Sequence, residues 1–95
     1  MHPALHTAAN GHLTLGLNEL PDAYWLSLVD TLVKHHGFRQ VGSPVVGLDT
    51  TIHPSFHCAE FSLAAGWDIW FGHYLLSESA AGDVFLQQLF NQLKT

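Results

Sequence analysis

Residues 21 to 36 have the spacing of an amphipathic helix, and they interrupt a chain whose other apolar patterns are mostly extended. Apolar side chains recur here every three to four residues, at positions Trp25, Leu28, Val29, Leu32 and Val33. Pro21 suits a first helical turn, and Gly37 is a natural stop after the last one. We therefore predict a helix from about Pro21 to His36, with one face buried against the rest of the chain.

The segments on both sides of this helix predict strands. Leucines alternate with other residues over 12–17, which is the period of a half-buried strand. Residues 38–48 read as an extended strand with a kink or bulge, because a glycine and a proline interrupt its valines. A turn over 49–54 is expected to lead into a long strand from Phe56 to Trp67, and a further turn into a strand over 73–76.

The last segment predicts a second helix, which Ser77 or Ser79 can cap. Its apolar stripe is formed by Phe85, Leu86, Leu89, Phe90 and Leu93. The element order β-α-β-β-β-α indicates an α+β fold, with an antiparallel sheet of three to four strands and two helices packed on one face. The 95 residues are expected to form a single domain, in which the aperiodic residues 1–11 are a flexible arm.

Composition excludes several functional classes. A net charge of −5 with only three Lys and Arg residues disfavours nucleic acid as a partner. No apolar run reaches the roughly 18 residues of a membrane-spanning helix, so no membrane partner is expected. A single cysteine excludes an internal disulfide, and with no secretory signal in view we expect a cytoplasmic protein. Because 47% of the residues are hydrophobic, some apolar surface is expected to stay exposed and mark an interface.

Signatures of catalysis and metal binding are weak. His53, His57 and Cys58 are of the types that bind zinc, but their spacing matches no standard motif and Pro54 disfavours a helix that would align the two histidines. Neighbouring residues on a strand point to opposite faces, so His57 is badly placed to activate Cys58, which we expect to be buried and inert. We predict no catalytic residue, no metal site, no cofactor and no enzymatic activity. Metal binding by the histidines is kept as a third hypothesis.

The most unusual segment runs from Gly66 to Tyr74 and concentrates aromatic side chains in a turn region. They cannot all point inward, so we expect Trp70 or Phe71 at the surface, where aromatic residues often dominate protein contacts. The alternative is that Trp67 and Tyr74 fill the core while Asp68 bonds the backbone of the turn, and we expect both: some of these side chains in the core and Trp70 or Phe71 at the surface. The residues predicted to contact a partner are Asp49, Glu60, Asp68, Trp70, Phe71 and Tyr74.

The stretch from Gly66 to Leu93, with Gly-Trp-Asp-Ile-Trp-Phe-Gly-His-Tyr-Leu-Leu before Ser-Glu-Ser-Ala-Ala-Gly-Asp and an apolar helix, resembles a pattern in small bacterial proteins. Some of these proteins are similar to immunity proteins of polymorphic toxin systems. The resemblance implies a compact cytoplasmic α+β protein without catalysis that blocks a cognate toxin by direct binding. It also implies an acidic surface, because many toxins of this kind are cationic nucleases.

Two different functions are consistent with these features of the sequence. The first is a non-enzymatic protein-binding inhibitor, most specifically an immunity protein whose acidic surface speeds encounter with a basic toxin. The second is a homo-oligomeric module, such as a homodimer, that binds a small ligand or acts as a scaffold. The excess of apolar residues suits both.

Overall fold

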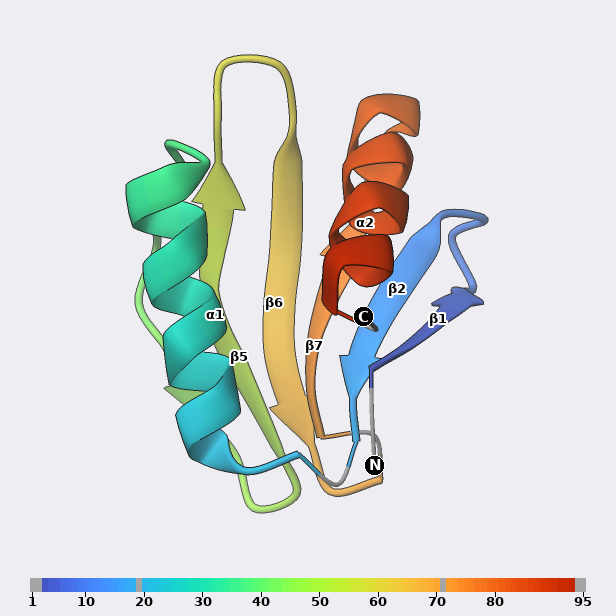
Figure 1. Ribbon diagram of the computed structural model, residues 1–95. Helices are drawn as coiled ribbons and strands as arrows, with labels where there is room; N and C mark the ends of the chain where they lie inside the picture. Colours follow the sequence, from blue (N-terminus) through green and yellow to red (C-terminus); the bar gives the residue numbers. More distant parts are fainter. Residues whose placement is uncertain (1–2, 19, 71, 94–95) are drawn as a thin grey trace.

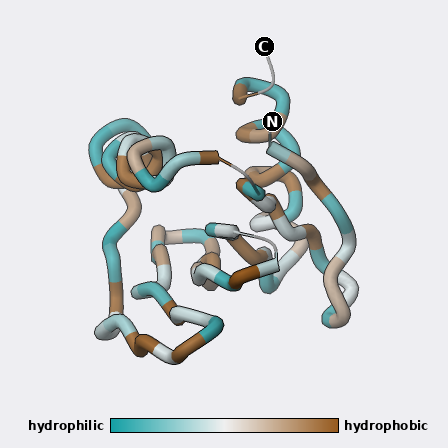
Figure 2. Tube along the Cα trace, turned by 90° about the horizontal axis from the view of Figure 1, so that it is seen from below, coloured by the Kyte–Doolittle hydropathy of each residue, from teal (hydrophilic) through white to brown (hydrophobic). Residues whose placement is uncertain are grey.

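The computed structural model describes residues 3–18, 20–70 and 72–93, and it shows two helices on one face of a single sheet (Figure 1). The first half of the chain contains β1 (Ala4–Thr7), β2 (Leu13–Leu17), α1 (Asp22–His35), β3 (Arg39–Val41) and β4 (Val45–Val46). The second half contains β5 (Thr50–His57), β6 (Ser62–Asp68), β7 (Gly72–Ser77) and α2 (Ala80–Leu93). Viewed from below, both helices lie on the same side of the strands, so the opposite face of the sheet carries no helix (Figure 2).

The sheet has seven strands in the order β1-β2-β7-β6-β5-β3, with β4 also paired to β5. Every pairing is antiparallel. The α+β class is confirmed, whereas a sheet of three to four strands is an underestimate. Three strands were not counted: β1 has only four residues, the predicted strand over 38–48 is divided into β3 and β4, and the predicted strand from Phe56 to Trp67 is divided between β5 and β6.

Two predicted segments are corrected. The aperiodic arm expected over residues 1–11 contains β1, which pairs with β2 from Ala4 opposite Gly16 to Thr7 opposite Leu13. The long strand expected from Phe56 to Trp67 is a hairpin, closed by a hydrogen bond from the Cys58 N–H to the Phe61 carbonyl at 3.0 Å. That turn contains neither glycine nor proline. The alternation of apolar residues in the sequence therefore continues across it, with no signal that the chain reverses.

The helix predicted from Pro21 to His36 is present as α1, and its side chains Trp25, Leu28 and Leu32 are buried. Phe38 lies just after α1, and its ring packs against α2 and against the β5–β6 hairpin. Its ring contacts Phe85 of α2 at 5.2 Å between centroids, and it also meets two rings from the β5–β6 hairpin. An aromatic cluster thus fills the core between the helices, in edge-on contacts that aromatic rings prefer.

The start of α2 is attached to the β1–β2 hairpin by Asp83. Its carboxylate accepts the backbone N–H of Leu13 at 2.8 Å and lies 2.8 Å from Nδ1 of His12. The bond to His12, and then that to Leu13, lower the pKa of Asp83. Ser79 caps the helix by accepting the N–H of Gly82 at 3.1 Å, which confirms one of the two predicted caps. No helix in the described part of the chain is long and apolar enough to cross a membrane.

Candidate functional site

Two turns meet at one end of the sheet and bring together residues that are distant in the sequence. The β4–β5 turn holds Leu48 and Asp49, and the β6–β7 turn holds Ile69 and Trp70, both at the bottom of Figure 1. The N–H of Ile69 donates to the carbonyl of Asp49 at 3.0 Å. A backbone hydrogen bond therefore holds the two turns side by side.

The side chains at this end are mainly apolar and exposed. Leu48 is fully exposed, and Trp70 is 76% exposed. The apolar surface continues along the edge of the sheet, where Val45 of β4 lies opposite Ile52 of β5. We call this region the end surface, and it consists of Val45, Val46, Leu48, Asp49, Ile52, Asp68, Ile69 and Trp70.

Asp68 determines the shape of the β6–β7 turn. Its Oδ1 accepts the backbone N–H of Trp70 at 2.6 Å, which is the turn bond that short acidic side chains often make. The indole of Trp70 is exposed on this turn. An exposed tryptophan on a backbone held in this way loses little freedom when a partner covers it.

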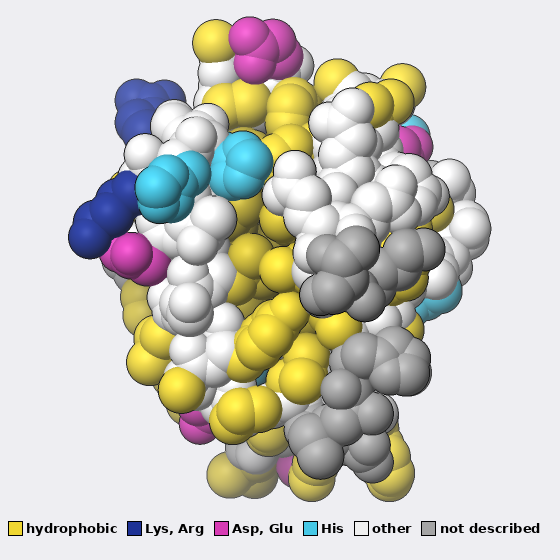
Figure 3. Space-filling model, in the orientation of Figure 1, with side chains coloured by type: hydrophobic (Ala, Val, Ile, Leu, Met, Phe, Trp, Pro, Cys, Tyr) yellow, Lys and Arg dark blue, Asp and Glu magenta, His cyan; other side chains and the backbone are white. Residues whose placement is uncertain are grey.

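Charges are distributed unevenly over the molecule. Asp22, at the start of α1, lies at the same end of the fold as Asp49 and Asp68. The described cations lie elsewhere: Lys34 is in the last turn of α1, and Arg39 is on β3 opposite His57. Figure 3 shows both dark blue side chains at the upper left, far from this end. The end surface is therefore negative as well as apolar.

The structure brings together three of the six predicted contact residues, Asp49, Asp68 and Trp70. Tyr74 lies on the helix-free face of the sheet, where it lines a hollow together with Asp68. Glu60 is in the β5–β6 turn at the opposite end, separated from Asp68 by the length of β6, about 20 Å for seven residues. Phe71 lies outside the described residues.

Sequence reasoning missed the apolar half of the end surface. It placed Val45 and Val46 in a kinked extended strand and Ile52 in a turn, with no prediction that any of them would be exposed. One feature of the sequence could have indicated this exposure: Gly42, Pro44 and Gly47 lie close together and leave room for a strand of only two residues. Such a short ribbon at a sheet edge has nothing to cover its side chains.

A second group of polar residues lies on the helix side of the sheet, beneath the first turn of α1. Nε2 of His73 is 2.9 Å from Oδ1 of Asp22, and Nδ1 of His73 is 3.0 Å from Nε2 of His53. With Asp22 ionised, His73 donates to the carboxylate and, while neutral, accepts a hydrogen bond from His53. Both imidazoles stack on the indole of Trp25 at 5.1 Å between ring centroids.

We expect this histidine chain to make the stability of the fold depend on pH. Burial lowers the pKa of His53 below its usual 6.5, and the neighbouring His73 lowers it further. The unfolded chain then binds this proton more tightly than the folded one, so the stabilisation is complete above about pH 6.5 and is lost as the pH falls through the lowered pKa. We expect the urea midpoint to fall between about pH 7.5 and pH 5.

The matched variant for this prediction is His53→Gln, which retains a side-chain N–H donor but does not titrate. Its urea midpoint should fall less than that of the wild type over the same pH interval. Equal losses in the two proteins would show that His53 is not responsible for the acid sensitivity.

The residues of the zinc hypothesis are separated by the fold. Cys58 is half-buried and not fully buried as expected, and its thiol lies 3.4 Å from the carbonyl of Phe61 and 3.6 Å from a carboxylate oxygen of Glu60. His53 contacts His73 instead of joining His57 and Cys58. Among residues 3–18, 20–70 and 72–93, no three histidine, cysteine or acidic side chains are grouped as metal ligands would be.

No family model, no curated protein and no solved structure matches this chain.

Proposed function

We propose that this protein is a non-enzymatic inhibitor that binds another protein through the end surface. The observation that carries this proposal is an exposed tryptophan on a turn held by hydrogen bonds, next to a fully exposed leucine and two aspartates. Tryptophan is one of the residue types enriched among those that dominate binding energy at protein interfaces. Apolar side chains gathered in one place on a small domain usually mark such an interface.

The charges favour a basic partner. Asp22, Asp49 and Asp68 are all at this end, and the two described cations are not. Complementary charge around an apolar centre accelerates association and discriminates against acidic proteins more than it raises affinity. A cationic protein therefore suits this surface.

In its most specific form, the proposal is an immunity protein that acts in the cytoplasm of a bacterium and neutralises a cognate toxin, such as a basic nuclease. The resemblance over Gly66 to Leu93 suggests this form of the proposal, but it assigns no contact residues. Blocking by contact needs no catalytic group, metal or cofactor on this chain.

The test is binding to the product of the neighbouring gene, measured by calorimetry with purified proteins. The wild type should bind it and abolish its toxic activity. Trp70→Ser should weaken binding at least about tenfold, because the indole would be the centre of the contact. Val84→Ser is the matched control, since Val84 is 60% exposed on α2, away from the end surface, and this variant should bind like the wild type.

Either of two results would contradict the proposal: the wild type neither binds nor neutralises that product, or Val84→Ser weakens binding as much as Trp70→Ser does. Circular dichroism of each variant shows whether the fold is retained, so that lost binding is not confused with unfolding.

A homo-oligomeric module is the second candidate, and the exposed edge of β4 and β5 favours it. Val45 and Ile52 are paired across the two strands on one face of this edge, and they would contact the same residues of a second copy about a two-fold axis. Sedimentation at several concentrations separates the two functions. A dimer that Val45→Lys dissociates supports the module, whereas a monomer at all concentrations supports the inhibitor.

A further inference from the structure

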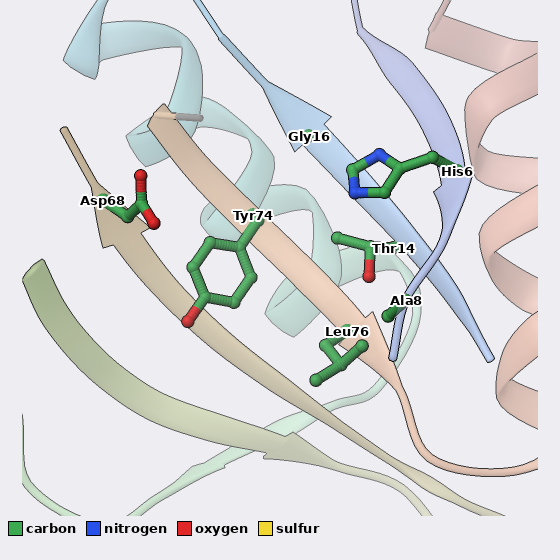
Figure 4. A pocket seen from close by; sticks show the side chains of 7 residues that line it. All are labelled: His6, Ala8, Thr14, Gly16, Asp68, Tyr74 and Leu76. Atoms are coloured by element: carbon green, nitrogen blue, oxygen red, sulfur yellow. The ribbon is translucent and has the colours of Figure 1, made fainter. Parts of the chain in front are cut away.

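The helix-free face of the sheet contains a hollow of about 190 Å³. It lies over β1, β2 and β7 and reaches the end of β6, and Figure 4 shows the side chains around it. Its lining includes His6, Thr14, Gly16, Asp68, Tyr74 and Leu76. None of the six belongs to the end surface except Asp68, so the hollow and the end surface meet at this carboxylate.

The hollow exists because Tyr74 has a glycine on each side. In the register of the sheet, Tyr74 lies opposite Gly16 on one neighbouring strand and opposite Gly66 on the other. A Cβ atom placed on Gly66 would be 2.5 Å from the Tyr74 hydroxyl, so the phenol ring lies over this glycine. Gly16 on the other side is not covered by the tyrosine, and a Cβ atom there would meet only the Ala4 carbonyl and the His6 ring of β1, each at 3.9 Å.

Nothing in the backbone requires a glycine at position 16. Its φ angle is outside the left-handed region, and a Cβ atom there would meet no atom closer than 3.9 Å. A glycine inside a strand weakens the strand, because it is more flexible when unfolded and has no side chain to pack. The effect of Gly16 that the structure shows is to keep the hollow open.

We propose that this hollow binds a small, flat, aromatic molecule that carries a positive charge. Its volume suits one ring with a short substituent, since a cavity of about 150 Å³ accepts benzene and drug-sized ligands need about 300 Å³ or more. The phenol of Tyr74 and the imidazole of His6 provide ring surfaces, and Leu76 adds an apolar wall. The carboxylate of Asp68 is the anionic group that a cationic substituent would face.

This inference does not depend on the proposed function. Binding at the hollow requires Gly16 and Tyr74, whereas the inhibitor surface requires Trp70 and Leu48, and Asp68 is the residue common to both. Failure of one leaves the other intact.

Benzamidine is the probe, and it is compared with benzoate and benzyl alcohol in NMR titrations of the whole chain. We expect benzamidine to bind saturably with a Kd on the order of 1 mM, as small fragments do. The backbone signals of Thr14, Gly16 and Leu76 should shift. Benzoate should bind at least about tenfold more weakly, because its charge has the same sign as that of Asp68.

Two variants separate the hollow from other sites. Gly16→Val fills the space over β2, and it should abolish benzamidine binding while the protein remains folded. Asp68→Asn retains an oxygen for the N–H of Trp70, so it should weaken benzamidine binding and leave that of benzyl alcohol unchanged. Thr7→Val is the control, because it adds a valine to the same hairpin on the opposite face of the sheet, where benzamidine binding should persist.

The proposal is overturned if benzamidine does not saturate, if benzoate binds equally well, or if Gly16→Val binds benzamidine like the wild type. It is also overturned if signals of the hollow shift with protein concentration alone, since a second copy would then cover this face.

Discussion

Replacing Phe38 by alanine should lower the free energy of unfolding by about 3–5 kcal/mol, the usual effect of removing a buried aromatic ring. Phe38 is only 4% exposed, and its ring contacts Phe56, Phe61 and Phe85. These three come from β5, the β5–β6 turn and α2, so the cavity would open between both helices and the sheet. The surrounding elements are tied by their own hydrogen bonds and cannot collapse fully into that space.

Urea unfolding followed by circular dichroism measures this loss. Val46→Ala is the control, because Val46 is 78% exposed and its truncation should change the stability by less than about 0.5 kcal/mol. A loss below about 1 kcal/mol for Phe38→Ala would mean that the aromatic cluster is not the centre of the core.

Gly66→Ala should destabilise the protein by about 1–3 kcal/mol, as overpacking of a close-packed site does. A Cβ atom there would lie 2.5 Å from the Tyr74 hydroxyl and 2.8 Å from the backbone carbonyl of Thr51. The tyrosine can rotate away, but the carbonyl belongs to a paired strand, so the sheet itself must shift.

Gly16→Ala provides the matched comparison, since Gly16 flanks the same tyrosine on the other side. Its Cβ atom would make only ordinary contacts, so this variant should be neutral or more stable by about 0.4–1 kcal/mol. Thermal unfolding of the two variants side by side measures the difference. If both glycines tolerate alanine equally, Tyr74 does not lie over Gly66 as the structure shows.

Local patterns were enough to predict the helices, β2 and the centre of β7, but they joined the end of β5 and most of β6 into one strand. The stripe of Trp25, Leu28 and Leu32 predicted α1 to within one residue at each end, because helical periodicity is set by the chain itself. The strand predicted over 73–76 is the centre of β7. Short edge strands were missed, since β1 and β4 are held by pairing with β2 and β5 and not by any pattern of their own.

The sequence indicated which residue types belong to the candidate site, but not how these residues are arranged in space. The exposure of Trp70 followed from the crowding of aromatic residues in a turn, and the structure confirms it. The proximity of Asp49 to that turn rests on a backbone hydrogen bond between residues twenty positions apart, which no local spacing reveals. For the same reason the pairing of His53 with His73 could not be anticipated.

The sequence by itself determined the α+β class, the two amphipathic helices and a surplus of apolar side chains too large for a small core to bury. These properties depend on periodicity and composition, which each segment carries independently of the others. Only the tertiary structure decided where the surplus lies and what stands beside it, because that depends on strand order and register. Those long-range pairings placed Trp70 beside Asp49 and Glu60 at the opposite end of the sheet. They also placed Tyr74 between two glycines, and its ring covers only one of them.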